Sequence, residues 1–276
     1  MKKILSIICA AIIMFVACAA DDCQQGSEFV TVSLGFDYYM EEMTRAELSS
    51  SCTRLDVWVV SEDDVSEVHQ ASTDDGFGNV SFTLNKYKTY TIYALAHKSA
   101  SAGTLSGTVV SFSDNKTTDM FWYTTSFTPS TTTNLSCTMN RNVGCFRLDT
   151  SDPVPDQVDA FLVNIYDCPV AWDVRGYATT ETDRVHTIHV TSRRADGSVL
   201  LSVYIFPSTL DAESKYNIKV VAVSGTDVVK SHTFNDVSIK AGYRTTYHGN
   251  FFDADAAFSS VFSIDNTWNE QMPIEF

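Results

Sequence analysis

The sequence contains one turn-and-strand pattern twice, at a fixed interval. The pattern Y-x-I-x-x-x-A begins at Tyr90 and again at Tyr216, an offset of 126 residues. A Thr-Leu-Asn or Thr-Leu-Asp triplet precedes each copy and begins at Thr83 or Thr209. Residues two apart share one face of a strand, so each copy predicts a turn and then a strand with one buried face. Two copies indicate a duplicated domain, since a solenoid needs at least three repeats; two unrelated strands of similar sequence are the alternative.

The rest of the chain reads as short strands separated by turns, and 276 residues suffice for two domains. The aromatic run 119–123 is interpreted as a partly buried strand, with a sugar-binding platform as the alternative. This pattern predicts an all-β chain of two tandem β-sandwich domains, residues 28–140 and 141–276. The other predicted strands are 29–34, 55–60, 80–84, 90–96, 108–112, 135–139, 143–148, 158–166, 185–191, 199–206, 216–223 and 233–239.

The N-terminus has the features of an export signal. Two lysines precede an apolar run, Ile4–Ala17, which is too short to span a bilayer of about 30 Å. We therefore predict a signal peptide at 1–17 and a tether at 18–27. The run Phe15-Val16-Ala17-Cys18 resembles a bacterial lipobox and implies a lipid on Cys18, whereas an ordinary signal peptide would leave a soluble protein. Asp21-Asp22 is similar to export signals of Bacteroidetes surface lipoproteins, which implies a cell-surface position on the outer membrane.

Charge and cysteine content limit the partners. The formal net charge is −15, so the chain lacks the basic surface that nucleic acid binding needs, and no such partner is expected. After Cys9 in the signal peptide and the lipidated Cys18, an odd number of cysteines remains, whose spacing matches no disulfide scaffold or zinc site. Their pairing stays open: Cys23, Cys52, Cys137, Cys145 and Cys168.

The spacing of the candidate catalytic and metal-binding residues does not match that of known sites. His186 and His189 are three apart on a predicted strand and therefore face opposite sides. The acidic turns 61–64 and 74–76 lack the alternating spacing of a calcium loop, and the segment 103–107 is not a G-x-S-x-G elbow. We therefore predict no metal, no cofactor and no enzymatic activity.

A resemblance to a known family appears at the predicted domain junction. The run N-R-x-V-G-x-F-R-L, Asn140–Leu148, resembles the strand between the two domains of fimbrillin-type proteins of Bacteroidales. The last part of the chain is also similar to the segments that close the chain in that family. The similar segments are 241–246, Gly249–Phe252, 262–264 and Trp268. The match is to its lipid-bearing FimB-like anchor and minor subunits, and it implies two transthyretin-like Greek-key sandwiches.

The resemblance also implies a role and an assembly mechanism. It implies a surface pilus component, an anchor or minor subunit or adhesin, that joins other fimbrial subunits by donation of a β-strand. Stalk subunits of that family are cleaved after an arginine, and Arg45 is the candidate here. Because Pro273 interrupts a short tail that would donate poorly, we expect an uncleaved anchor. The strand that cleavage would release, predicted at an edge, comprises Phe29, Val30, Thr31, Val32, Ser33 and Leu34.

Several alternatives stay open at this point. A glycan-binding outer-membrane lipoprotein of the SusE or SusF sort is also built from tandem sandwiches. The sequence does not distinguish an anchor from a tip or stalk role. It also does not give the oligomeric state or identify a host or glycan ligand.

Overall fold

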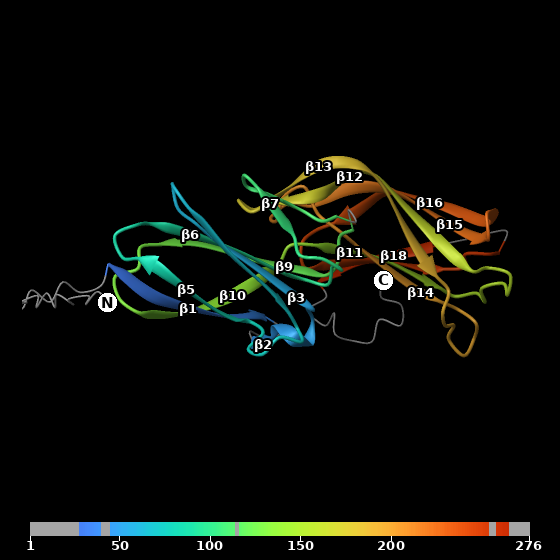
Figure 1. Ribbon diagram of the computed structural model, residues 1–276. Coiled ribbons are helices and arrows are strands. Elements are labelled where there is room, and N and C mark those ends of the chain that lie inside the picture. Colours follow the sequence, from blue (N-terminus) through green and yellow to red (C-terminus); the bar gives the residue numbers. More distant parts are fainter. Residues whose placement is uncertain (1–27, 40–44, 114–115, 254–257, 265–276) are drawn as a thin grey trace, which may run out of the picture.

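The computed structural model describes residues 28–39, 45–113, 116–253 and 258–264. They form an elongated molecule of two β-sandwiches placed end to end (Figure 1), which confirms the predicted all-β fold. The described part contains no helix of the length and hydrophobicity needed to cross a membrane. The predicted signal peptide, tether and lipidated Cys18, together with Trp268 and Pro273, lie outside the described residues.

The first sandwich is one sheet that folds over on itself, in the order β2-β1-β10-β9-β6-β3-β4, with β5 also paired to β1. Alternation explains its core: Val80, Phe82 and Leu84 point inward from β5, while the residues between them are exposed. A short 3₁₀ turn, η2 (Leu48–Ser50), follows β2. The strands are β1 (Phe29–Tyr39), β2 (Arg45–Glu47), β3 (Arg54–Val60), β4 (Val65–Ala71), β5 (Asn79–Asn85), β6 (Tyr90–His97), β9 (Met120–Phe127) and β10 (Thr133–Arg141).

The second sandwich consists of two separate sheets. One has the order β14-β11-β17-β18, and the other contains β16-β15-β12 with β13 on β12. Their inner faces meet in a continuous core that includes Phe146, Phe161 and Phe251. The strands are β11 (Gly144–Thr150), β12 (Ala160–Asp173), β13 (Tyr177–His189), β14 (Leu200–Ile205), β15 (Ser214–Ser224), β16 (Asp227–Ile239), β17 (Tyr243–Gly249) and β18 (Phe258–Ile264).

The two sandwiches repeat one pattern of strand pairing. β1 pairs antiparallel with β5 and parallel with β10, and β11 likewise pairs antiparallel with β14 and parallel with β17. The order β4-β3-β6-β9 returns as β13-β12-β15-β16. The repeated tyrosines fall on the equivalent strands β6 and β15, both are buried, and each hydroxyl bonds to the backbone: Tyr90 accepts from Asn85 N–H and Tyr216 donates to Phe206 O, both at 3.0 Å.

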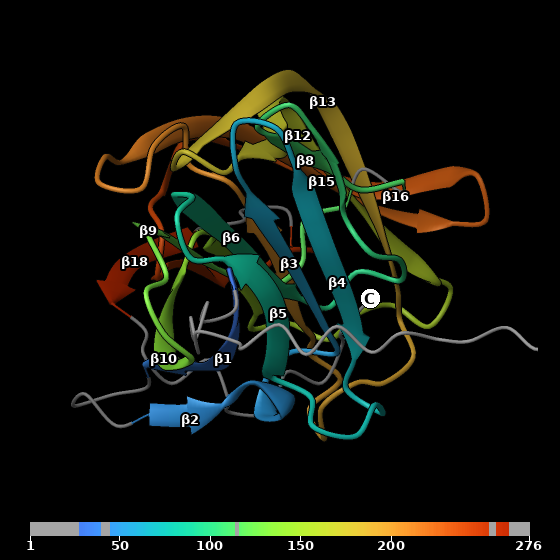
Figure 2. The same ribbon diagram turned by 60° about the vertical axis from the view of Figure 1, so that its left-hand side comes forward.

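A hairpin from the first half joins the second half. β7 (Thr104–Ser106) and β8 (Val109–Ser111) form this hairpin, and β8 pairs with the end of β12 (Figure 2). The hairpin precedes the predicted boundary at residue 140 and yet extends a sheet of the second sandwich. Asp173 strengthens the joint, because its carboxylate accepts a hydrogen bond from Thr108 Oγ1 at 2.9 Å.

Apolar side chains from both halves form a third core beneath this hairpin. Trp172 lies at its centre, stacked on Phe206 with ring centroids 5.5 Å apart and edge-on to Trp122 at 5.7 Å. Trp58 and Val110 belong to the same cluster and are fully buried. Such a shared core should make the halves unfold together, which two separately folded domains need not do.

A buried carboxylate fixes the base of the hairpin. Asp56, fully buried on β3, accepts hydrogen bonds from Gly103 N–H at 2.6 Å and from His97 Nε2 at 2.8 Å. It also lies 2.8 Å from Nδ1 of His69. Burial opposes ionisation of this carboxyl, but the hydrogen bonds outweigh it and lower its pKa.

The sequence misses some elements and misreads one triplet. β4 was not predicted because its side chains are exposed or half-buried and give little apolar signal. β7, β17 and β18 were not predicted as strands either. The triplet at Thr83, interpreted as a turn, is the end of strand β5, whereas the copy at Thr209 lies outside the strands, in an irregular segment between β14 and β15.

Candidate functional site

The first strand is an interior strand, which corrects the prediction that Phe29–Leu34 lies at an edge. β1 pairs with β5 from Phe29 to Gly35 and with β10 from Val32 to Tyr38, so most of it has a neighbour on each side. The parallel pairing with β10, the last strand of the sandwich, places this strand inside the sheet.

The side chains of β1 hold the first core together. Val32, Leu34, Phe36 and Tyr38 all point inward and are at most 7% exposed. Tyr38 also packs against Phe121 with ring centroids 4.6 Å apart. Each such side chain contributes about 1.5–3 kcal/mol by leaving water. Release of β1 would therefore cost the first sandwich a large part of its core.

Arg45, the candidate cleavage residue, begins strand β2. Its backbone pairs with Tyr39, so it belongs to a short antiparallel ladder with β1 and not to a loop between strands. Cleavage after Arg45 stays a prediction. The peptide bond after Arg45 lies within a paired strand. This position makes the bond a poor protease substrate, since proteases prefer exposed loop tips.

The open part of the first sandwich lies between β9 and β10. These strands pair only at Asn140–Trp122 and Arg141–Phe121. Beyond these pairs, the stretch 133–139 of β10 has, among the described residues, a strand neighbour on its β1 side only. We call this unpaired stretch of β10, together with 123–127 of β9, the β9–β10 seam.

The direction of the backbone shows which groups meet the seam. Asn142 donates its N–H to Met120 O at 3.1 Å, so even-numbered residues of β10 direct their backbone toward β9. Asn134 and Thr138 therefore present their N–H and C=O groups to the seam, whereas odd-numbered residues bond to β1. An exposed row of this kind is a template for another strand.

Half-buried apolar side chains line the seam. Leu135 on β10 and Tyr123 and Phe127 on β9 pack on the first core without being fully covered by described residues. The Tyr123 hydroxyl and the Cys137 thiol interact across it. Burial raises the pKa of Tyr123 and raises the pKa of Cys137 to about 11, so both side chains are neutral at pH 7.

The second sandwich shows what such a seam can hold. β17, the equivalent of β10, pairs with β11 on one side and along its whole length, from Tyr243 to Gly249, with β18 on the other. The pairing is antiparallel. The place beside β10 that corresponds to β18 is taken by no strand of the described residues.

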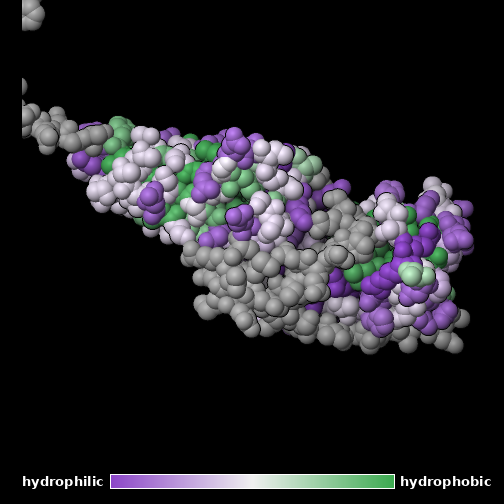
Figure 3. All heavy atoms as spheres, turned by 90° about the horizontal axis from the view of Figure 1, so that it is seen from below, coloured by the Kyte–Doolittle hydropathy of each residue, from purple (hydrophilic) through white to green (hydrophobic). Residues whose placement is uncertain are grey.

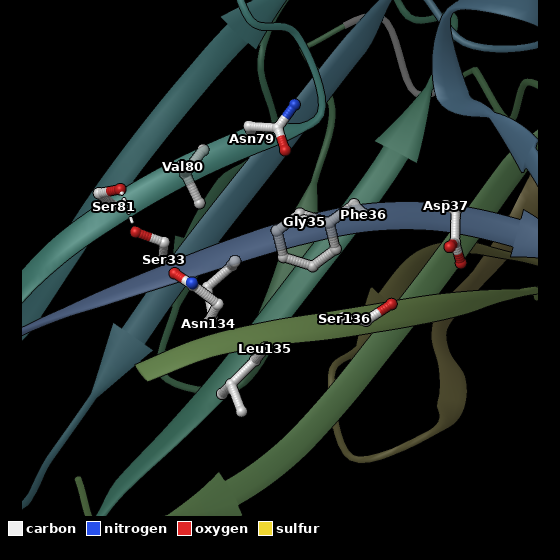
Figure 4. A pocket seen from close by; sticks show the side chains of 11 residues that line it. Ser33, Gly35, Phe36, Asp37, Asn79, Val80, Ser81, Asn134, Leu135 and Ser136 are labelled. Atoms are coloured by element: carbon white, nitrogen blue, oxygen red, sulfur yellow. Dashed lines mark hydrogen bonds between the residues drawn. The ribbon is translucent and has the colours of Figure 1, made fainter. Parts of the chain in front are cut away.

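A shallow polar groove lies on the outer face next to the seam. It has a volume of about 610 Å³ and crosses β5, β1 and β10. Figure 4 shows polar side chains from all three strands around it, and Gly35 is among its lining residues. The Oγ atoms of Ser33 and Ser81 are 2.9 Å apart within it. Its remaining polar lining comes from Asp37, Asn79, Asn134 and Ser136.

The other predicted sites are single residues without a shared geometry. His186 is buried and His189 exposed, as expected for opposite faces of β13. The described residues contain no group of three side chains suited to hold a metal ion. The thiols of Cys52, Cys137, Cys145 and Cys168 are buried and free, while Cys23 lies outside the described residues.

The architecture defines the chain as a protein of two tandem β-sandwiches, and comparison with known proteins shows which proteins have a similar fold. No family model and no curated protein matches the chain. Solved structures do. An adhesin candidate from Bacteroides thetaiotaomicron has 12% sequence identity and a TM-score of 0.54, over 86% of this chain and 98% of that one.

Two further solved structures are similar to this chain over most of its length. A candidate polysaccharide-binding protein of Bacteroides thetaiotaomicron has 10% identity and a TM-score of 0.52, over 87% of this chain and 100% of that one. The fimbrial anchor protein Mfa2 from Porphyromonas gingivalis has 10% identity and a TM-score of 0.48, over 86% and 98%. The chain thus has the two-sandwich fold that the fimbrillin resemblance implied, and at these identities the likeness concerns the fold.

Proposed function

We propose that this protein is a non-enzymatic surface lipoprotein of the fimbrillin type, an anchor or minor subunit that receives a β-strand from a neighbouring subunit at the β9–β10 seam. The observation that carries the proposal is the place beside β10 that no strand of the described residues takes, whereas β18 fills the corresponding place in the second sandwich. The fold shared with an adhesin candidate supports a surface role. We take 28–140 and 141–276 as the two domains, linked by the hairpin β7–β8.

The seam offers both elements that strand addition needs. Backbone groups of Asn134 and Thr138 point into it and would bond to the incoming strand, and apolar side chains on its inner side would be covered by alternate residues of that strand. By analogy with β17 and β18, the incoming strand runs antiparallel to β10. Its inward residues should be apolar, since they would meet Leu135, Tyr123 and Phe127.

Retention of β1 fits an anchor better than a stalk. In this proposal no strand must leave before another binds, because among the described residues the stretch 133–139 of β10 has a strand neighbour on its β1 side only. The chain therefore keeps Phe29–Leu34, the tether and the lipid on Cys18, and it stays attached to the outer membrane while the seam holds the fimbrial partner.

A proline substitution tests the seam directly. Asn134→Pro removes one backbone donor from the side of β10 that faces the seam and leaves the ladder with β1 intact. We expect fewer fimbrial subunits to co-purify with this variant than with the wild type, at an unchanged melting temperature. Thr187→Pro is the matched control: Thr187 is exposed on β13, and its N–H also points away from the neighbouring strand, because Val190 N–H bonds to Asp159 O at 2.8 Å. Equal recovery from both variants would overturn the proposal.

A second candidate function is glycan binding, and the polar groove over β5, β1 and β10 favours it. Serine, asparagine and aspartate side chains can bond to sugar hydroxyls, and one solved structure of the same fold is a candidate polysaccharide-binding protein. Asn79→Ala and Ser81→Ala should then abolish retention on an immobilised polysaccharide and leave the recovery of fimbrial subunits unchanged.

A further inference from the structure

Exposed apolar side chains gather at the end of the first sandwich where the N-terminal residues join it. Phe29 is 53% exposed, Tyr87 71% and Val65 53%. Figure 3 shows hydrophobic residues at this end of the molecule. Solvent-exposed large apolar residues of this kind, when gathered, commonly mark a surface of interaction.

These residues belong to one continuous surface, although they come from different strands. Phe29 is the Cα partner of Asn85, and Lys86 N–H bonds to Glu28 O at 2.8 Å, so the start of β1 lies beside the β5–β6 turn that carries Tyr87. Lys88 in that turn lies 3.2 Å from Asp63 in the turn that precedes Val65. We call Phe29, Val65, Tyr87 and the turns 61–64 and 86–89 the N-terminal tip.

We infer that the N-terminal tip rests on the surface of the lipid bilayer, an inference that depends on the proposed lipid anchor at Cys18. Nine residues lie between Cys18 and Glu28, and the ten residue steps that join the two reach about 36 Å at most when fully extended. The tip is therefore the part of the folded body nearest to the membrane. Aromatic residues with neighbouring lysines are the side chains that favour the bilayer interface. The Lys86 ammonium lies 5.0 Å from the centre of the Tyr87 ring.

The charges of the tip specify the kind of contact. Glu28, Glu62, Asp63 and Asp64 outnumber Lys86 and Lys88, so attraction to anionic lipids does not drive it. Insertion of apolar and aromatic side chains into the bilayer interface drives the contact instead. Contact with the bilayer should accordingly be insensitive to salt and to the anionic lipid content, unlike a polybasic membrane signal.

Tryptophan quenching tests this inference on the full-length acylated protein in vesicles of phosphatidylethanolamine and phosphatidylglycerol. Tyr87→Trp places a reporter at the tip. Val228→Trp is the matched control, because Val228 is 65% exposed in the β15–β16 region of the second sandwich, at the opposite end of the molecule (Figure 1). The four native tryptophans give the background, which the wild-type protein measures. With lipids that carry a quencher near the headgroup, the emission that residue 87 adds to this background should be lost and the emission that residue 228 adds should be retained, in low and high salt alike. Phe29→Ser with Tyr87→Ser should speed dissociation from the vesicles, and Val228→Ser should not.

The outcomes separate this inference from the anchor proposal. If labelled palmitate enters the wild-type chain but residue 87 is quenched no more than residue 228, the tip inference is overturned and the anchor stands. If no palmitate enters the chain, both are overturned. Quenching that disappears in high salt would replace apolar insertion with an electrostatic contact and would also overturn the inference.

Discussion

Truncation of Trp172 tests whether the two sandwiches are one cooperative unit. The side chain is fully buried between Trp122 and Phe206, in the core that both halves share. Trp172→Ala should cost about 3–5 kcal/mol, the usual range for a buried tryptophan. At about 2–4 °C per kcal/mol for a chain of this size, the melting temperature should fall by about 6–20 °C.

Scanning calorimetry on the purified protein gives the measurement, and two variants serve as controls. Trp172→Phe keeps the stacked ring and removes an indole N–H that has no hydrogen-bond partner among the described residues, so it should cost less than about 1.5 kcal/mol. Val228→Ala, at an exposed position, should stay within about 0.5 kcal/mol. If the Ala variant lowers the melting temperature no more than Val228→Ala, or if it melts one sandwich and leaves the other unchanged, the shared core does not couple the halves.

Three further predictions concern the anchor, the cleavage site and pH. Cys18→Ser should release the protein from the membrane fraction, and a variant that remains membrane-bound would disprove lipid anchoring. Arg45→Ala should leave pilus assembly unchanged, and intact mass should show a mature chain that begins at Cys18; a start at Ala46 would instead indicate a stalk or tip subunit. Burial, with Arg184 and Lys116 nearby, lowers the pKa of His186 to about 3. The unfolded chain takes up this proton below about pH 6.5, so stability should fall by about 1.4 kcal/mol per pH unit from there toward pH 3. His186→Gln should flatten that profile in urea titrations at several pH values, and an unchanged profile would show that His186 is not the group responsible.

The sequence predicts local features of the fold well. Alternation places the inward rows of β6 and β15 correctly, and Tyr90 and Tyr216 mark equivalent strands of the duplicated pattern. This succeeds because a half-buried strand imposes its period of two on the side chains it carries.

Long-range pairing could not be read from the same signal. Nothing in the residues near Phe29 announces that β1 pairs in parallel with a strand about a hundred residues later, which makes it interior. The hairpin at Thr104–Ser111 has few apolar residues and no pattern that assigns it to the second sandwich. The seam cannot be predicted from the sequence either, because it is defined by the lack of a second strand beside β10 among the described residues, and the pairing of β17 with β18 is what reveals it.

Photo-crosslinking at Asn134 tests the central claim most directly. A photoreactive side chain at this position, in protein expressed on whole cells, projects from the outer face of β10 beside the seam and can reach the neighbouring residues of a strand added there. The same group at Val228 provides the control. The account predicts an adduct at position 134 with a segment of a fimbrial subunit whose residues alternate between apolar and polar, in antiparallel register with β10, and none at position 228. Adducts absent from position 134, or equally abundant at position 228, would contradict the claim that a partner's strand completes the first sandwich.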